Sequence, residues 1–261
     1  ANELFGQQVL VSNERIIASA PGADSKKGKL YIYDRQVQSD GSTVDWDIPT
    51  RQNEIVLPNA VAGDLFGQSM AGSKDLEFIV VGIPGREESE DLDSTLNSGG
   101  IAVYRWNGIE YELLQEINVN TLLRQELNGF DQFGTSVDIS QDGKTIIVGA
   151  PYSDATFSNQ GKAYVLEMDT TDSTVGTYEL TQVITSPVAS GGERFGFNVA
   201  VNPAGTSFAV QGLAGASRVE IPMIDGTTFD SGSMKIVKTQ AGSGAVYTFS
   251  KLGNKFVFGQ N

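Results

Sequence analysis

The sequence predicts an all-β protein, a β-propeller built from four-stranded antiparallel blades. The main observation is a Phe-Gly pair that opens four similar segments of the chain. Each pair precedes an alternating apolar stretch, a tight turn and a second apolar run, which ends in a Gly/Ala-Pro element in three of the segments. The pairs are Phe5-Gly6, Phe66-Gly67, Phe133-Gly134 and Phe195-Gly196, spaced 61, 67 and 62 residues apart. A fixed period of this size is typical of propellers and stacked repeats.

The third repeat shows the expected design of one blade most clearly. Its four strands are predicted at 135–140, 145–149, 162–168 and 177–185. Asp142-Gly143 predicts a two-residue hairpin turn, because such turns need the positive φ that this pair tolerates. The run 145–149 is apolar and rich in β-branched residues, which indicates a strand buried on both faces. Pro151 follows it and lacks the N–H of a ladder, so the strand should end there.

The other repeats follow the same order. In the second repeat the strands are predicted at 69–71, 78–81, 101–106 and 111–117, with a hairpin turn at Asn107-Gly108. The fourth strand is expected within 44–57 in the first repeat and at 255–258 in the last. The chain is therefore expected to be a single domain, 1–261, with repeats at about 1–61, 62–128, 129–190 and 191–261. We expect each Phe to pack between blades and its Gly to adopt a positive φ.

Composition excludes several classes of function. The chain has 18 basic and 32 acidic residues, a net charge of -14, and neither cysteine nor histidine. Disulfides, thiolate zinc sites, cysteine nucleophiles and Ser-His-Asp triads are thus excluded. The negative charge weighs against nucleic acid as a partner, and no apolar run is long enough to predict membrane insertion. The charge fits either a well-solvated surface or the binding of cations or basic partners.

One set of motifs resembles a known family. Taken together, Phe133-Gly-Thr-Ser-Val, Asp142-Gly, Val148-Gly-Ala-Pro151 and Gly161-Lys-Ala-Tyr164 are similar to the FG-GAP repeat of integrin α-subunit propellers. The resemblance implies a β-propeller, a place outside the cell or on a cell or particle surface, and recognition or adhesion rather than catalysis. Propellers of this family usually have seven blades, so four repeats would form a small closed ring or belong to something larger.

The resemblance does not extend to calcium binding. Calcium-binding repeats of the family carry Asp-x-(Asp/Asn)-x-Asp-Gly-x-x-Asp between their first two strands, which supplies several oxygen ligands. Here 141–144 retains one carboxylate and 202–205 has none. We therefore expect no metal at these hairpins and no cofactor.

Candidate binding residues lie in the loops between the second and third strands. Asp24, Glu87 and Asp154 each follow the proline position by three residues. They could form an anionic ring for a cation or a basic partner, or each could cap its own loop through an Asx-turn. Asp91, Asp93 and Asn97 could bind calcium weakly, or belong to a solvated acidic loop.

The fourth repeat has a long insertion, 214–243, that contains Arg218 and Lys235 as further ligand-binding candidates. Its segments 218–224 and 234–238 are predicted to pair around Asp225-Gly226. The insertion would either bind a partner or cover a sheet edge, as terminal repeats do. Tyr152, Phe157, Tyr178 and Phe229 could form a sugar-binding platform or belong to the core.

The predicted function is non-catalytic recognition or adhesion, with a protein or carbohydrate bound through the loops. One alternative is a structural subunit of an extracellular or viral assembly, with possible self-assembly through a flat face. A further alternative is a hydrolase that uses only carboxylates such as Asp91 and Asp93, although no acid with a raised pKa is evident beside them.

Overall fold

A computed structural model describes residues 3–35, 53–86, 98–118, 131–154, 156–169, 176–187, 191–213, 237–238 and 244–259. The regular secondary structure of the described chain is almost entirely β-strand, arranged in antiparallel sheets. The two described helices are short, and neither has the length or apolar character that a membrane-spanning helix needs. The all-β prediction is therefore confirmed.

The elements follow one another in four groups. The first repeat contains β1 (Val9–Val11), β2 (Arg15–Ala20), α1 (Ala23–Lys26), β3 (Lys29–Asp34) and β4 (Asn53–Ile55). The second contains β5 (Met70–Gly72), the 3-10 helix η1 (Lys74–Leu76), β6 (Phe78–Ile83), β7 (Gly100–Trp106) and β8 (Tyr111–Asn118). The third contains β9 (Ser136–Ile139), β10 (Thr145–Ala150), β11 (Lys162–Asp169) and β12 (Thr177–Thr185). The fourth contains β13 (Asn198–Val201), β14 (Ser207–Gly212), β15 (Val237–Lys238), β16 (Ala245–Leu252) and β17 (Lys255–Phe258).

Each repeat forms one antiparallel sheet, and we number the sheets one to four. The first three sheets have the orders β1-β2-β3-β4, β5-β6-β7-β8 and β9-β10-β11-β12. The fourth has the order β13-β14-β16, and both β15 and β17 pair with β16. All six residues of β6 and of β10 are buried, as predicted for the second strand of a repeat. These are the meanders expected for propeller blades.

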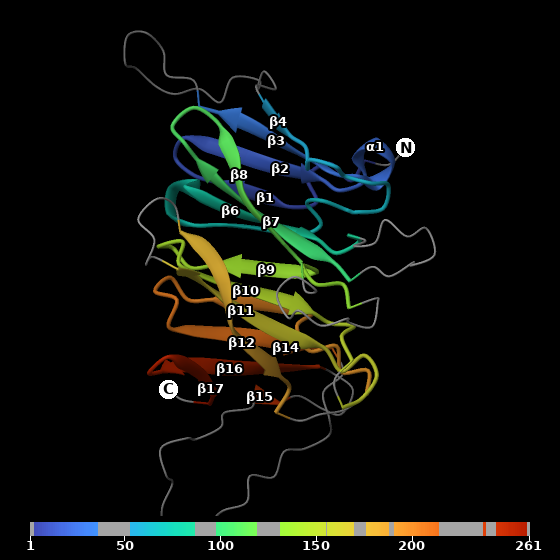
Figure 1. Cartoon of the computed structure of the whole chain (residues 1–261), viewed down its shortest axis with the longest axis vertical. Coiled ribbons are helices and arrows are strands. Elements are labelled where there is room, and N and C mark those ends of the chain that lie inside the picture. Colours follow the sequence, from blue (N-terminus) through green and yellow to red (C-terminus); the bar gives the residue numbers. More distant parts are fainter. Residues whose placement is uncertain are drawn as a thin grey trace, which may run out of the picture.

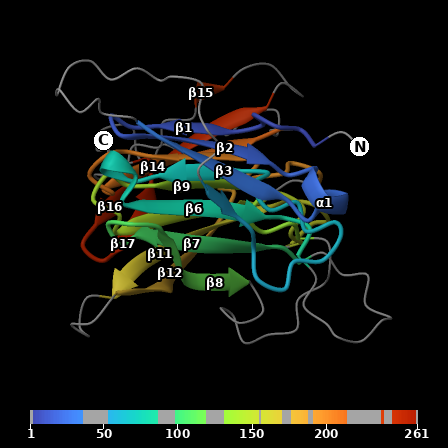
Figure 2. The same ribbon diagram turned by 90° about the horizontal axis from the view of Figure 1, so that it is seen from above.

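The four sheets stack along the long axis of the molecule and do not close into a ring. Figure 1 places the first sheet and the N-terminal end at the top, and the fourth sheet and the C-terminal end at the bottom. The view from above in Figure 2 looks down this stack. Three large apolar clusters join the first sheet to the second, the second to the third and the third to the fourth. No such cluster joins the fourth sheet to the first within the described residues.

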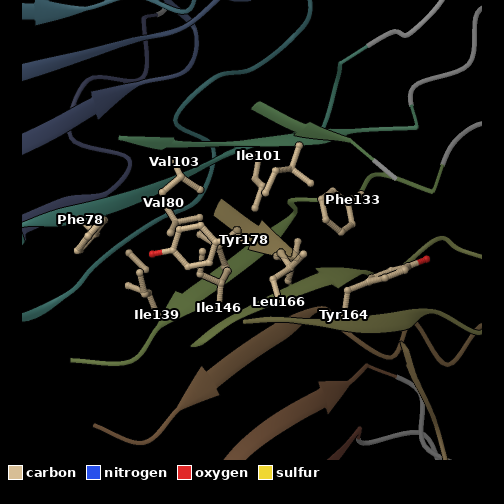
Figure 3. Close-up of a cluster of buried hydrophobic side chains, with 14 of the residues drawn as sticks. Phe78, Val80, Ile101, Val103, Phe133, Ile139, Ile146, Tyr164, Leu166 and Tyr178 are labelled. Atoms are coloured by element: carbon tan, nitrogen blue, oxygen red, sulfur yellow. The ribbon is translucent and has the colours of Figure 1, made fainter. Parts of the chain in front are cut away.

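The central cluster illustrates how two sheets pack. Figure 3 shows Val80 and Ile101 of the second sheet meeting Ile146 and Leu166 of the third. All four side chains are fully buried. Because strand side chains alternate between faces, β7 and β11 each supply apolar residues to two clusters at once. This two-sided burial keeps the inner sheets in place.

The sheets are also tied by pairs of hydrogen bonds between their fourth strands. The Gln115 amide accepts the N–H of Tyr178 at 2.8 Å and donates to its carbonyl at 3.2 Å. Gln182 does the same with Phe256, with both distances 2.8 Å. The two glutamines sit at equivalent positions, next to the register shift in β8 and in β12. We call these pairs the amide clamps.

One local prediction needs correction. The turn at Asp142-Gly143 is a four-residue loop rather than a two-residue one, because Ser140 and Thr145 form the closing pair. Asp142 Oδ1 accepts both the Ser140 hydroxyl and the Lys144 N–H, and these bonds stabilise the longer loop.

Only two residues of the insertion in the fourth repeat, Val237 and Lys238, lie within the described residues. Most of the predicted hairpin lies outside the described residues. Val237 and Lys238 pair with β16. These two residues extend the edge of the fourth sheet.

Candidate functional site

The turns between the first and second strands of the first three repeats line a groove with a volume of about 480 Å³. The groove is formed by residues 10–13, 72–76 and Gln141, and we call it the hairpin groove. Its lining includes η1 and the residues that join it to β5. Three repeats thus contribute to one surface, although they are far apart in sequence.

Short side chains fix the turns that form this groove. Ser12 Oγ accepts the Arg15 N–H at 3.1 Å, and Ser73 Oγ accepts the Phe78 N–H at 2.9 Å. Such serine contacts stabilise tight turns by replacing a backbone partner. The Lys74 N–H donates to Gln141 O at 2.9 Å, so the turns of the second and third repeats are joined directly.

The buried side of η1 is held by a tyrosine. Tyr111 Oη donates to Leu76 O at 2.6 Å. Burial raises the pKa of the Tyr111 hydroxyl, while the nearby Arg15 acts in the opposite direction. The phenol is therefore a permanent donor at physiological pH, and the shape of the groove does not change with its ionisation.

The groove combines apolar and charged groups. Leu10 and Val11 supply apolar surface, and Val11 is well exposed. Asn13, Lys74 and Asp75 are exposed and offer both donors and acceptors. This mixture suits an extended ligand with apolar and polar groups, because a few placed polar groups orient a ligand on an apolar surface.

Two acids of the predicted ring, Asp24 and Asp154, lie in the described residues, and each has a local partner. Asp24 forms an ion pair with Lys29 at 2.8 Å, and Lys29 also reaches Glu54 at 3.4 Å. Asp154 Oδ1 accepts the Asn159 N–H at 2.7 Å, so Asp154 caps its own loop. Within the described part of the chain, no three acidic side chains meet in a way that could hold a metal ion.

The other predicted binding residues cannot be placed. Glu87, Asp91, Asp93, Asn97, Arg218 and Lys235 lie outside the described residues.

The aromatic residues predicted to form a sugar-binding platform lie in different environments. Tyr178 is buried, and its hydroxyl donates to Gly143 O, so it belongs to the core. Tyr152 lies beside Arg194, whose guanidinium carbon is 5.1 Å from the ring centroid. Phe157 is 47% exposed, and Phe229 lies outside the described residues. No aromatic platform forms among the described members of this set.

Sequence reasoning missed a buried acid that lies two residues before Phe in three repeats. These acids are Asp64, Asp131 and Glu193, and none is more than 3% exposed. Their fixed distance from Phe-Gly was a signal that could have found them. In the first repeat the same position holds Glu3, which is exposed.

Each buried acid holds the chain near a loop, and we call the three the loop anchors. Asp64 Oδ2 accepts the Val61 N–H at 2.9 Å and pairs with Arg86 at 2.8 Å. Asp131 accepts the hydroxyl of the fully buried Ser153 at 3.0 Å. Burial is the main cause that raises the pKa of Asp131.

In the fourth repeat, Glu193 accepts the hydroxyls of Ser186 at 2.7 Å and Tyr247 at 2.6 Å. Burial raises the pKa of the Tyr247 hydroxyl, so this phenol keeps its proton. The three anchors lie in the interior, where they support loops and a substrate has no access.

Comparison with known proteins agrees with the repeat design. Residues 118–166 match the family described as the FG-GAP repeat. The third repeat carries the FG-GAP signature. The match spans the end of β8 to the middle of β11, which includes Phe133-Gly134 and Pro151. The FG-GAP resemblance noted in the sequence is confirmed for this segment.

Comparisons over the whole chain are much weaker. No curated protein sequence matches the chain. A proposed 6-phosphogluconolactonase from Bacteroides uniformis is similar in structure, with 13% identity and a TM-score of 0.48. The alignment covers 96% of this chain and 54% of that one, so the chain spans about half its length. A protein of unknown function from Desulfotomaculum acetoxidans has 10% identity and a TM-score of 0.36, with 97% and 68% covered.

Proposed function

We propose that this chain is a non-catalytic recognition module that binds a protein partner in the hairpin groove. The observation that carries the proposal is the groove itself, which three repeats line and in which Leu10 and Val11 lie beside polar and charged residues. A rigid scaffold that presents turn residues on one surface is a common design for binding. No cofactor is part of the proposal.

The charge and the acids support binding rather than catalysis. Asp131 and Asp138 both have a pKa raised mainly by burial. Each is occupied as an acceptor within the chain, Asp131 for Ser153 and Asp138 for Val201 N–H at 2.6 Å. The net charge of -14 favours a basic or neutral partner over nucleic acid. FG-GAP repeats are often extracellular, and we propose a location outside the cell or on a particle surface.

A charge reversal in the groove tests this proposal. The wild-type chain would be screened against a displayed random peptide library and a glycan array. Hits would be measured again on Lys74→Glu and on the control Lys144→Glu, an exposed lysine outside the groove. We expect peptide hits that bind Lys74→Glu about fivefold more weakly and bind the control unchanged.

The outcomes separate the alternatives. Peptides that bind Lys74→Glu as tightly as wild type would place the binding surface elsewhere. Hits confined to the glycan array would replace the protein partner with a carbohydrate.

A second candidate is a structural subunit of a larger assembly. The end of the stack at the first sheet favours it, because Phe5 and Val9 there are 58% and 51% exposed.

A further inference from the structure

The three interfaces between sheets share one docking contact. Phe66, Phe133 and Phe195 are fully buried, and each forms a parallel bridge to a glycine of the preceding sheet, namely Gly28, Gly99 and Gly161. The Phe N–H donates to the carbonyl just before that glycine, at 3.2, 2.9 and 2.8 Å. The Phe-Gly pair of one repeat therefore docks onto the sheet before it.

The glycine of the Phe-Gly pair lies very close to the backbone of the preceding sheet. A Cβ at Gly134 would lie 2.2 Å from Gly100 O, and one at Gly196 would lie 2.3 Å from Lys162 O. The Gly134 carbonyl also accepts the Ser69 hydroxyl at 2.8 Å. A side chain on this glycine would thus separate the sheets.

The receiving sheet carries a small residue where the pair arrives. This residue is Ser19, Gly82 or Gly149 in the first, second or third sheet. A Cβ at Gly82 would lie 2.1 Å from Gly134 O, and one at Gly149 would lie 1.9 Å from Gly196 O. We call this position the receiver. It is identified in every repeat by its carbonyl, which accepts the N–H of the glycine in the same repeat's Phe-Gly pair.

In the first repeat, the Phe5-Gly6 pair has the same conformation, but the space that the preceding sheet fills in the other repeats is open. Gly6 has a φ of +81°, close to the +88° to +91° of Gly67, Gly134 and Gly196, and its N–H donates to Ser19 O at 2.8 Å. A Cβ at Gly6 would meet no atom within 4 Å, and Phe5 is 58% exposed. Val9 pairs with Ala18, which pairs in turn with Tyr31, so Val9 shares this outer face.

The fourth repeat lacks a small receiver. Its equivalent position is Gln211, whose carbonyl accepts the Gly196 N–H at 3.0 Å. Asn198 Nδ2 donates to Gln211 Oε1 at 2.8 Å, so the long side chain is held on the outer surface of the sheet. This side chain occupies the region where the next Phe-Gly carbonyl arrives at Gly82 and Gly149.

We propose that the outer face of the first sheet, around Phe5 and Gly6, docks onto a repeat sheet of a partner chain with glycine or serine at its receiver position. Gln211, held by Asn198, prevents the fourth sheet of a second copy from acting as that partner. Without such a block, a head-to-tail contact between copies would continue into rings or filaments. The proposal does not depend on the hairpin groove, because neither Phe5 nor Gln211 lines it.

The test uses a receiver-only chain as the probe. Gln211→Gly copies the receiver of the second and third sheets, and adding Phe5→Ser removes its own docking end. Sedimentation velocity would give the mass of this double variant, of wild type and of their mixture. We expect each alone to be a monomer and the mixture to form a one-to-one complex.

Two further chains assign the contact to Phe5. Phe5→Ser in the wild-type partner should weaken the complex at least about tenfold, because the substitution removes the apolar area that Phe5 buries on docking. Phe157→Ser, at another exposed phenylalanine, should leave it unchanged. Gln211→Ser, which copies Ser19, replaces Gln211→Gly if the glycine variant unfolds.

Three results would overturn the proposal. One is a receiver-only chain with native circular dichroism that stays monomeric in the mixture. Another is a complex that Phe5→Ser does not weaken. The third is a wild-type chain that self-associates through Phe5, since Gln211 should prevent this.

Discussion

We expect the glutamine of each amide clamp to make a measurable contribution to the free energy of unfolding. Replacing Gln182 with leucine removes the two hydrogen bonds to Phe256, both 2.8 Å, and leaves a similar volume of side chain. A neutral hydrogen bond contributes about 1 kcal/mol net, so the free energy of unfolding should fall by about 2 kcal/mol. Because the site is only partly buried, water can replace some of this, and the lower limit is about 1 kcal/mol.

The repeat supplies an internal replicate of this experiment. Gln115→Leu breaks the equivalent pair of bonds to Tyr178 and should cost the same within about 0.5 kcal/mol. The exposed Gln7→Leu serves as the control and should change the free energy of unfolding by less than about 0.5 kcal/mol. Urea denaturation followed by circular dichroism and by tryptophan fluorescence would measure all three. Coincident transitions from the two probes are needed, since only a two-state transition gives one free energy.

Two results would refute this reasoning. If Gln182→Leu and Gln115→Leu both matched the control, the clamps would not stabilise the stack. If the two differed by more than about 1 kcal/mol, the interfaces would not be energetically equivalent.

Three other substitutions test the packing of the repeats. Gly149→Ala should lower the free energy of unfolding by about 3 kcal/mol or more, because its Cβ would lie 1.9 Å from Gly196 O; a melting curve like that of wild type would contradict this. Arg86→Met should cost about 3–5 kcal/mol by leaving the buried Asp64 charge unpaired, and adding Asp64→Asn should recover much of the loss in urea denaturation. Burial raises the folded-state pKa of Asp131, so its ionisation lowers stability as pH rises from the unfolded pKa through the folded one. The stability of Asp131→Asn relative to wild type should therefore increase between pH 4 and pH 7, and a constant difference would contradict the pKa shift.

Much of the architecture could be predicted because the repeat averages out local ambiguity. The second strand at 145–149 was found within one residue, since a fully apolar run before Pro151 has few other interpretations. The prediction that Phe packs between sheets is confirmed for Phe66, Phe133 and Phe195. Phe5 differs only because no described sheet precedes it. The local Phe-Gly motif gives no information about whether such a neighbouring sheet is present.

Register was harder to predict than strand position. Two glycines, Gly99 and Gly100, precede the third strand of the second repeat, and Gly99 makes the parallel bridge to Phe133 as Gly161 does to Phe195. Ala102 therefore occupies the position of Tyr164, and Tyr104 takes over the ring contact with Phe66 at 6.1 Å. The sequence alone does not indicate which of the two adjacent glycines forms the bridge, because each allows the positive φ that the bridge requires.

The candidate site was predicted least well. The notable acids of the sequence are exposed or lie outside the described residues, whereas Asp64 and Asp131 are buried structural groups. The hairpin groove was not predicted either, because its residues come from three repeats and none carries a motif. Composition marks charge, but it does not indicate which turns meet across sheets.

The loop anchors explain how one framework tolerates such different loops. The acid position before Phe is constant, but its partner changes from Arg86 to Ser153 to Tyr247. A carboxylate can accept from a guanidinium, a serine or a phenol, so the anchor holds while the neighbouring sequence varies. The segments between the second and third strands accordingly differ greatly in length, from 8 residues after β2 to 32 after β14. The fold therefore requires only the acid and some hydrogen-bond donor at this position. The rest of each loop is free to vary for binding a partner.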